Sequence, residues 1–156
     1  IRIALGMNAF IPNAYVSDLS TRLELYNRIC LITDCYQIDS LQSELIDRFG
    51  PLVSEVEGLF YTIRVKVEST NSGIVSLVAK GTSIVVELTE SLGGGREALR
   101  KILGSGVDIG DRRIYLSSKI LGDDWRQCLF QVIRHINSSN KKMFMLLGVL
   151  LDLFFG

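Results

Sequence analysis

Cysteine, histidine and proline are scarce in this chain, and each shortage excludes a class of protein. The 156 residues include three cysteines, one histidine and two prolines. Three cysteines without a CxxC pair do not make a disulfide framework, and a single histidine excludes a histidine-rich metal site. We therefore expect reduced thiols, as in the cytoplasm, and no metal ion or other cofactor in this chain. Two prolines are also too few for a disordered, low-complexity segment.

The chain lacks an excess of charge of either sign. Lysine and arginine number 17, aspartate and glutamate number 17, and the formal net charge is zero. A domain whose main partner is a phosphate backbone carries a clear basic excess, so this composition argues against nucleic-acid binding. Apolar residues make up 47% of the chain, which is enough for the core of one domain of this length.

Recognisable catalytic motifs are also missing. The glycine-rich segments 93–96 and 104–106 lack the Lys-Ser/Thr pair that completes a phosphate-binding loop, and neither has the GxGxxG spacing. His135 lies beside Arg134, away from the apolar stripe of its expected helix, and no nucleophile motif stands near it in sequence. We therefore expect no enzymatic activity from this chain itself.

The first half of the chain has the periodicity of helices. Three helices are predicted within residues 17–70, because apolar residues recur there at helical spacing. Ser17 or Asp18 can cap the first helix, and Gly50-Pro51 ends the second. The segment 63–67 also alternates like a strand, but we assign it to the third helix. The predicted inward stripes are Leu19, Leu23, Tyr26 and Cys30; Ile38, Leu41, Leu45 and Phe49; and Val56, Leu59, Phe60, Ile63 and Val67.

The second half has the patterns of β-hairpins. Runs 74–79 and 84–88 are rich in β-branched residues and are joined through Lys80-Gly81, and runs 107–109 and 112–116 flank Gly110-Asp111. A short strand is expected near the N-terminus, and two further helices are expected over 96–103 and from Asp123 or Asp124 onward. The prediction is an α+β fold, in which a three-helix part precedes a small antiparallel sheet with two further helices, within a single domain of residues 1–140.

Residues 141–156 form an apolar tail. Eleven of the fourteen residues 143–156 are large and apolar, and Lys141-Lys142 precede them. A helix of this length spans about 21 Å, which is less than the ~30 Å hydrocarbon core of a bilayer. We expect the tail to pack on its own domain or on a neighbouring copy, and membrane association is the alternative. The role of the tail is left open.

Glu44, Asp47 and Arg48 stand out among the charged residues. On a helix they span about 100° of one side, off the predicted apolar stripe. One interpretation is a solvated face with an i,i+4 pair between Glu44 and Arg48. The other is a charged patch that binds a partner protein.

Between residues 10 and 52, a series of short motifs resembles a known family. Their order and spacing are similar to those of the C-terminal domain of bacterial transcription-repair coupling factors (Mfd). The resemblance extends over roughly residues 1–138 and does not include the tail. The motifs are Phe10-Ile11-Pro12, Tyr15, Asp18, Arg22-Leu23, Leu25-Tyr26, Arg28-Ile29 and the run from Glu44 through Gly50-Pro51 to Leu52.

The resemblance implies a non-catalytic, autoinhibitory interaction domain. Its parent would be a cytoplasmic ATP-dependent DNA translocase that displaces stalled RNA polymerase and recruits nucleotide excision repair. In the family this domain docks on the UvrB-like module of the parent and competes there with UvrA. ATP, Mg²⁺, DNA and RNA polymerase would bind other parent domains, and no membrane partner is implied. Matched residue by residue, the docking patch falls on Glu44, Asp47 and Arg48.

The alternative is a nucleic-acid-binding accessory domain of a DNA-repair helicase. It would need a basic patch gathered on one face of the molecule. The candidate residues for this patch are Arg96, Arg100, Lys101, Arg112 and Arg113.

Overall fold

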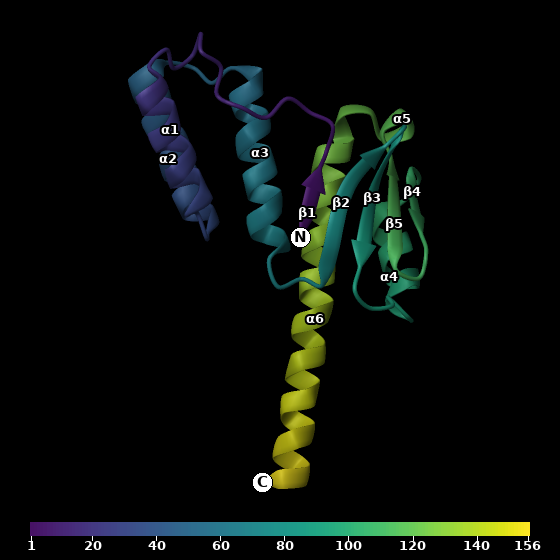
Figure 1. Ribbon diagram of the computed structural model, residues 1–156. Helices are drawn as coiled ribbons and strands as arrows, with labels where there is room; N and C mark the ends of the chain where they lie inside the picture. The colour runs from purple at the N-terminus through teal and green to yellow at the C-terminus, as the bar shows by residue number, and fades with distance from the viewer. The chain divides into compact units, whose positions relative to one another are not determined.

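The computed structural model describes all residues 1–156, which form two compact units (Figure 1). Residues 5–70 make a helical unit, and residues 1–4 with 71–156 make a sheet unit. The helical unit contains α1 (Leu19–Cys30), α2 (Cys35–Phe49) and α3 (Ser54–Ser69). The three helices predicted within residues 17–70 are therefore confirmed, and segment 63–67 is helical.

Polar caps define the ends of these helices. The Asp18 side chain accepts a hydrogen bond from the Thr21 backbone N–H at 2.8 Å and begins α1. Asp34 and Gln37 form a reciprocal capping box at the start of α2. Gly50 ends α2 with a φ of 89°, a conformation that favours glycine.

The buried face of α1 differs from the predicted stripe. Leu19 and Leu23 are 61% and 55% exposed, and the residues that α1 buries are Leu25 and Ile29. Tyr26 is the member of the predicted stripe that packs against the core, and its hydroxyl accepts a hydrogen bond from the Ile11 backbone N–H at 2.7 Å. The stripes on α2 and α3 are confirmed in their main members. The core of the helical unit consists of Ile11, Val16, Leu25, Ile29, Ile38, Leu41, Leu45, Val56, Phe60 and Ile63.

The sheet unit contains five strands, in the order β1-β2-β3-β5-β4. Both predicted hairpins are present, and their strands pair antiparallel. The N-terminal strand adds a parallel neighbour to β2 at the sheet edge, so the sheet is mixed. The strands are β1 (Arg2–Ala4), β2 (Ile74–Lys80), β3 (Ser83–Leu88), β4 (Val107–Ile109) and β5 (Arg113–Ser117).

Helices α4 (Gly95–Leu103) and α6 (Trp125–Phe155) lie on one side of this sheet (Figure 1). Leu77, Val86 and Ile114 are aligned across β2, β3 and β5 and are fully buried. They share a face because alternate residues of a strand point to the same side. The short helix α5 (Ser118–Leu121) and a 3₁₀ turn at Gly122–Asp124 lead into α6.

The apolar tail continues α6 without a break. Helix α6 runs on beyond the end of the sheet (Figure 1), and the large apolar side chains from Met143 onward are exposed. Of the two expected packing partners, its own domain is therefore excluded, because an uninterrupted helix has no turn that would fold it back, and packing on a neighbouring copy stays a prediction. None of the helices combines the length and apolar character needed to cross a membrane.

Candidate functional site

The charged face of α2 is organised around Glu44. The Arg28 guanidinium, which projects from α1, donates two hydrogen bonds to this carboxylate, at 2.6 Å to Oε2 and 2.9 Å to Oε1. Arg48 donates a third, from Nη1 to Oε2 at 3.0 Å. We call Arg28, Glu44 and Arg48 the charged cluster. Its side chains are 35–41% exposed, so a partner can reach them.

The Glu44 carboxylate of this cluster is ionised at physiological pH. The Arg28 hydrogen bonds, followed by that from Arg48, lower the pKa of Glu44 to about 2 against the opposing effect of desolvation. These hydrogen bonds, which Arg28 donates to Glu44, also raise the pKa of Arg28. The cluster therefore presents two cations that share one anion.

Arg48 is also positioned by the aromatic side chains at the end of α2. Its guanidinium lies 4.9 Å from the Phe49 ring centroid, and the Phe49 ring contacts that of Tyr15 at a centroid distance of 5.9 Å. The Tyr15 hydroxyl shares its one proton between two carbonyl oxygens, that of Gly50 at 2.8 Å and that of Leu45 at 3.2 Å. Partial burial raises the pKa of Tyr15. These contacts hold the C-terminal turn of α2 in place, and with it the direction of Arg48.

Asp47 differs from its two neighbours in the predicted patch. The structure joins Glu44 to Arg48, as the i,i+4 spacing predicts, but Asp47 is exposed and makes no hydrogen bond or ion pair within the chain. An exposed carboxylate without an internal partner is available for a cation on another molecule. Glu44, Asp47 and Arg48 are called the docking patch below.

Sequence reasoning missed Arg28 as part of this site. It lies 16 residues before Glu44 and on another helix, so helical spacing cannot reveal the pair. Arg28 does belong to one of the motifs that carried the family resemblance, and this was the available signal.

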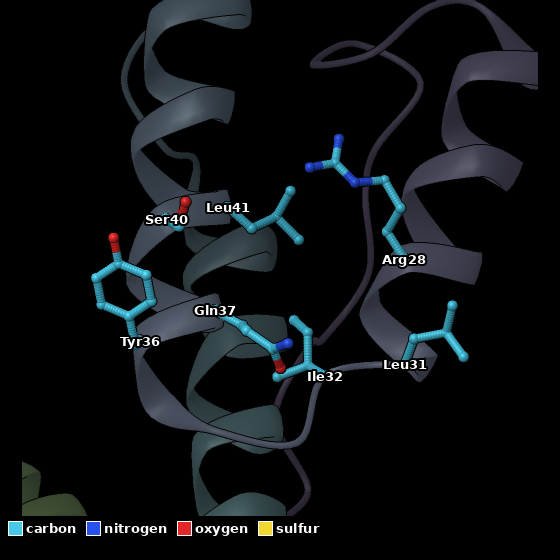
Figure 2. A pocket seen from close by; sticks show the side chains of 7 residues that line it. All are labelled: Arg28, Leu31, Ile32, Tyr36, Gln37, Ser40 and Leu41. Carbon is cyan, nitrogen blue, oxygen red and sulfur yellow. The ribbon is translucent and has the colours of Figure 1, made fainter.

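An open cavity of about 320 Å³ lies beside the charged cluster, where α1 meets α2 (Figure 2). Leu31 and Tyr36 at its rim are 77% and 81% exposed. Tyrosine and arginine are the side chains most enriched at the energetic centres of protein interfaces. The charged face of α2 thus adjoins a hollow with exposed apolar and aromatic groups. Its lining residues are Arg28, Leu31, Ile32, Tyr36, Gln37, Ser40 and Leu41.

The candidate basic residues of the sheet unit do not form one free patch. Arg100 donates to Glu97 at 3.1 Å and to the carbonyl of Ile109 at 3.1 Å. Arg113 donates to Glu87 at 3.3 Å. Its neighbour Ile114 on β5 points to the opposite, buried side of the sheet, so Arg113 lies on the sheet's other face. Two of the five cations are thus paired within the chain, which disfavours the nucleic-acid alternative.

The residues that could hold a metal ion are dispersed. No three His, Cys, Asp or Glu side chains come together as ligands. Cys30, Cys35 and Cys128 are free thiols, and burial raises the pKa of Cys128. His135 lies half-buried on α6.

Comparison with known proteins identifies the family of the chain. The model of the TRCF domain family matches residues 5–93, which is more than half of the chain. The chain belongs to the TRCF domain family. A transcription-repair-coupling factor of Staphylococcus epidermidis is 30% identical over 146 residues, covering 89% of this chain and 12% of the relative. Its counterpart in Rickettsia bellii is 34% identical over 85 residues, covering 54% of this chain and 8% of the relative.

The fold agrees with a solved TRCF structure. The crystal structure of the C-terminal domain of transcription-repair coupling factor superposes with a TM-score of 0.72 at 20% sequence identity, covering 88% of this chain and 91% of that chain. The resemblance found in the sequence is therefore confirmed, as is the α+β fold. This TRCF chain spans about a tenth of the length of the curated relatives that it matches.

Proposed function

We propose that this TRCF domain is a non-catalytic, autoinhibitory docking domain of its parent coupling factor. In this proposal the docking patch of α2 binds the UvrB-like module of the same parent chain. Docking covers the surface that UvrA recognises, so the parent does not recruit excision repair until the domain is released. The single observation that carries the proposal is Asp47, an unpaired and exposed carboxylate beside the internally neutralised Glu44–Arg48 pair.

The geometry of the patch supports a specific protein partner. Arg28 and Phe49 already orient the charged groups, so binding would immobilise few additional side-chain rotamers. A complementary surface would place a cation opposite Asp47 and an acceptor opposite Arg48. The exposed rim of the neighbouring cavity, with Leu31 and Tyr36, offers apolar contact area around these charges.

The wider role of the parent is part of the same proposal. The proposal assigns it ATP-dependent DNA translocation, displacement of stalled RNA polymerase and location in the bacterial cytoplasm, where free thiols such as those of this chain persist. ATP, Mg²⁺, DNA and RNA polymerase would bind the other domains of the parent. This domain would then act only through contact with its neighbour.

Binding in trans tests the proposal. The purified chain should associate with a parent protein that lacks this domain, and Asp47→Lys should weaken the association at least tenfold by placing like charges opposite each other. Asp108→Lys makes the same charge change at an exposed position on β4 and should leave the affinity unchanged. Equal affinities of both variants and the natural chain would refute docking through α2.

A further inference from the structure

The tail of α6 continues a periodic apolar seam that the domain uses for its own core. Along α6 the seam residues alternate at spacings of four and three, which keeps them on one side of the helix. In the first half of α6 they are covered, since Leu129, Ile133 and Ile136 are at most 5% exposed. Asn140 ends the covered part by donating to the carbonyl of Ser72 at 2.7 Å. The whole seam is Leu129, Ile133, Ile136, Asn140, Met143, Leu147, Leu150 and Phe154.

Beyond Asn140 the same seam is uncovered. Met143, Leu147 and Leu150 are 51%, 50% and 47% exposed. The positions flanking the seam are apolar too, and they are Phe144, Leu146, Leu151 and Leu153. Both lysines of the tail, its one aspartate and its interior glycine lie on the other side of the helix, together with Met145 and Val149. The tail is therefore apolar around most of its circumference, and its widest continuous apolar face contains the seam and carries no charge.

We propose that this apolar face pairs antiparallel with the same face of a second copy of the chain. The eight seam and flanking side chains between Met143 and Phe154 expose on the order of 1,000 Å², which is the upper limit of what the pairing can bury and is comparable with the ~800 Å² that each partner of a standard interface buries. Two-fold pairing of identical surfaces closes on itself, so assembly stops at a dimer.

The antiparallel direction follows from a cavity at the start of the tail. This cavity, of about 350 Å³, is bordered by Ile136, Asn140, Met143 and Phe144 of α6 and by the loops around Gly73 and Thr89. When Leu147 of one copy packs against Leu150 of the other, Phe154 of the second copy lies opposite Met143 of the first. Each cavity then receives the aromatic end of the other tail.

The distribution of charge disfavours a lipid surface as the occupant. A helix that lies in a membrane interface has a strongly charged, usually basic, polar face. The outward side of the tail instead carries Met145, Gly148, Val149 and Phe155, and its only charges are Lys141, Lys142 and Asp152. This pairing goes beyond the docking proposed for α2, which lies in the other unit of the chain.

Light scattering coupled to size-exclusion chromatography tests the pairing on the whole chain. The 17.4 kDa chain should elute with twice its mass at micromolar concentration. The double variant L147E/L150E should raise the dissociation constant at least tenfold, because it buries like charges at the centre of the pair. The matched control M145E/V149E adds the same charge to the outward side and should leave the dimer intact. All of these residues are exposed in the single chain, and circular dichroism should report unchanged folding.

Disulfide trapping tests the direction of the pair. In a background carrying C30S and C35S, which leaves only the buried Cys128, a chain with M143C should cross-link to a chain with F154C. Cross-linking of M143C chains mainly to each other would overturn the antiparallel arrangement. A monomeric natural chain, equal loss of the dimer in both double variants, or a monomer that floats with phosphatidylglycerol–phosphatidylcholine vesicles would each overturn the proposal.

Discussion

Glu44 connects two helices through charge, and its titration should be visible in the stability of the chain. Its pKa is about 2 in the folded state, against an ordinary value of 4.5. Because the folded value is the lower one, the stabilisation is fully present above pH 4.5 and is lost as the pH falls through 2. The pair is about one-third exposed, so solvent screening limits the effect to about 0.2–1 kcal/mol.

The variant Glu44→Gln isolates this contribution. Urea unfolding at pH 7 should show it to be less stable than the natural chain by up to about 1 kcal/mol. The difference should shrink when the same comparison is made near pH 2, where the carboxyl group of the natural chain is also becoming neutral. A difference that stays constant with pH would mean that Glu44 acts through shape and not through charge.

The Tyr15 hydroxyl group stabilises the fold by its hydrogen bonding to the end of α2. Tyr15→Phe removes the donor to the Leu45 and Gly50 carbonyls and should lower the free energy of unfolding by about 1 kcal/mol. Tyr36→Phe is the matched control, since Tyr36 is 81% exposed and its change should cost less than about 0.5 kcal/mol. Chemical denaturation of the two variants compares them directly, and equal stabilities would contradict the anchoring role of Tyr15.

At the scale of elements, the approach of the N-terminal segment to α3 depends on Gly58. A Cβ at this position would lie 2.1 Å from the carbonyl oxygen of Asn8. Alanine favours a helix over glycine by about 1 kcal/mol, yet the clash with backbone outweighs this gain. Gly58→Ala should therefore lower the melting temperature. Gly148→Ala lies in the exposed part of α6, where no other atom approaches, and should not lower the melting temperature. A Gly148→Ala variant that melts at a lower temperature than Gly58→Ala would contradict this account.

The helices and hairpins could be predicted from the sequence because their signals are local. Asp18 and Gly50 marked helix ends, and the β-branched runs of β2 and β3 flanked a glycine turn. The inward face of α1 could not be predicted, because Leu19 and Leu25 are equally apolar and the residues that share the core with Leu25, such as Ile38, lie elsewhere in the sequence. The parallel partner of β2 was missed for the same reason, since 69 residues separate Ala4 from Ile74.

The candidate site was predictable only in part. The Glu44–Arg48 pair follows from helical spacing, whereas the contribution of Arg28 depends on how α1 packs against α2. This packing also determines what a triple substitution of the docking patch would do to stability. Replacing Glu44, Asp47 and Arg48 by alanine removes the link to Arg28, so the variant should lose up to about 1 kcal/mol of stability. Asp47→Ala alone, with no internal contact to lose, should melt like the natural chain in calorimetry.

At the scale of the whole molecule, the central claim is that the α2 face holds the parent in a closed state. The ratio of the closed to the open form changes tenfold for each ~1.4 kcal/mol of difference in their free energies. Removing a docked charge should therefore shift this ratio measurably. Contacts that are buried at such an interface are worth about 2–5 kcal/mol, and those at its rim less. Opening the parent should expose the UvrA-binding surface and raise the basal ATPase together.

The affinity of the full-length parent for UvrA, measured with Asp47→Ala in place, tests this claim most directly. We expect the affinity to rise at least tenfold over that of the natural parent, with unchanged melting of this domain. The control variant Asp108→Ala in the sheet unit should leave the affinity of the parent for UvrA unchanged. An unchanged UvrA affinity in a stably folded Asp47→Ala parent, and also in the triple alanine variant, would contradict the account and leave the α2 face as solvated surface.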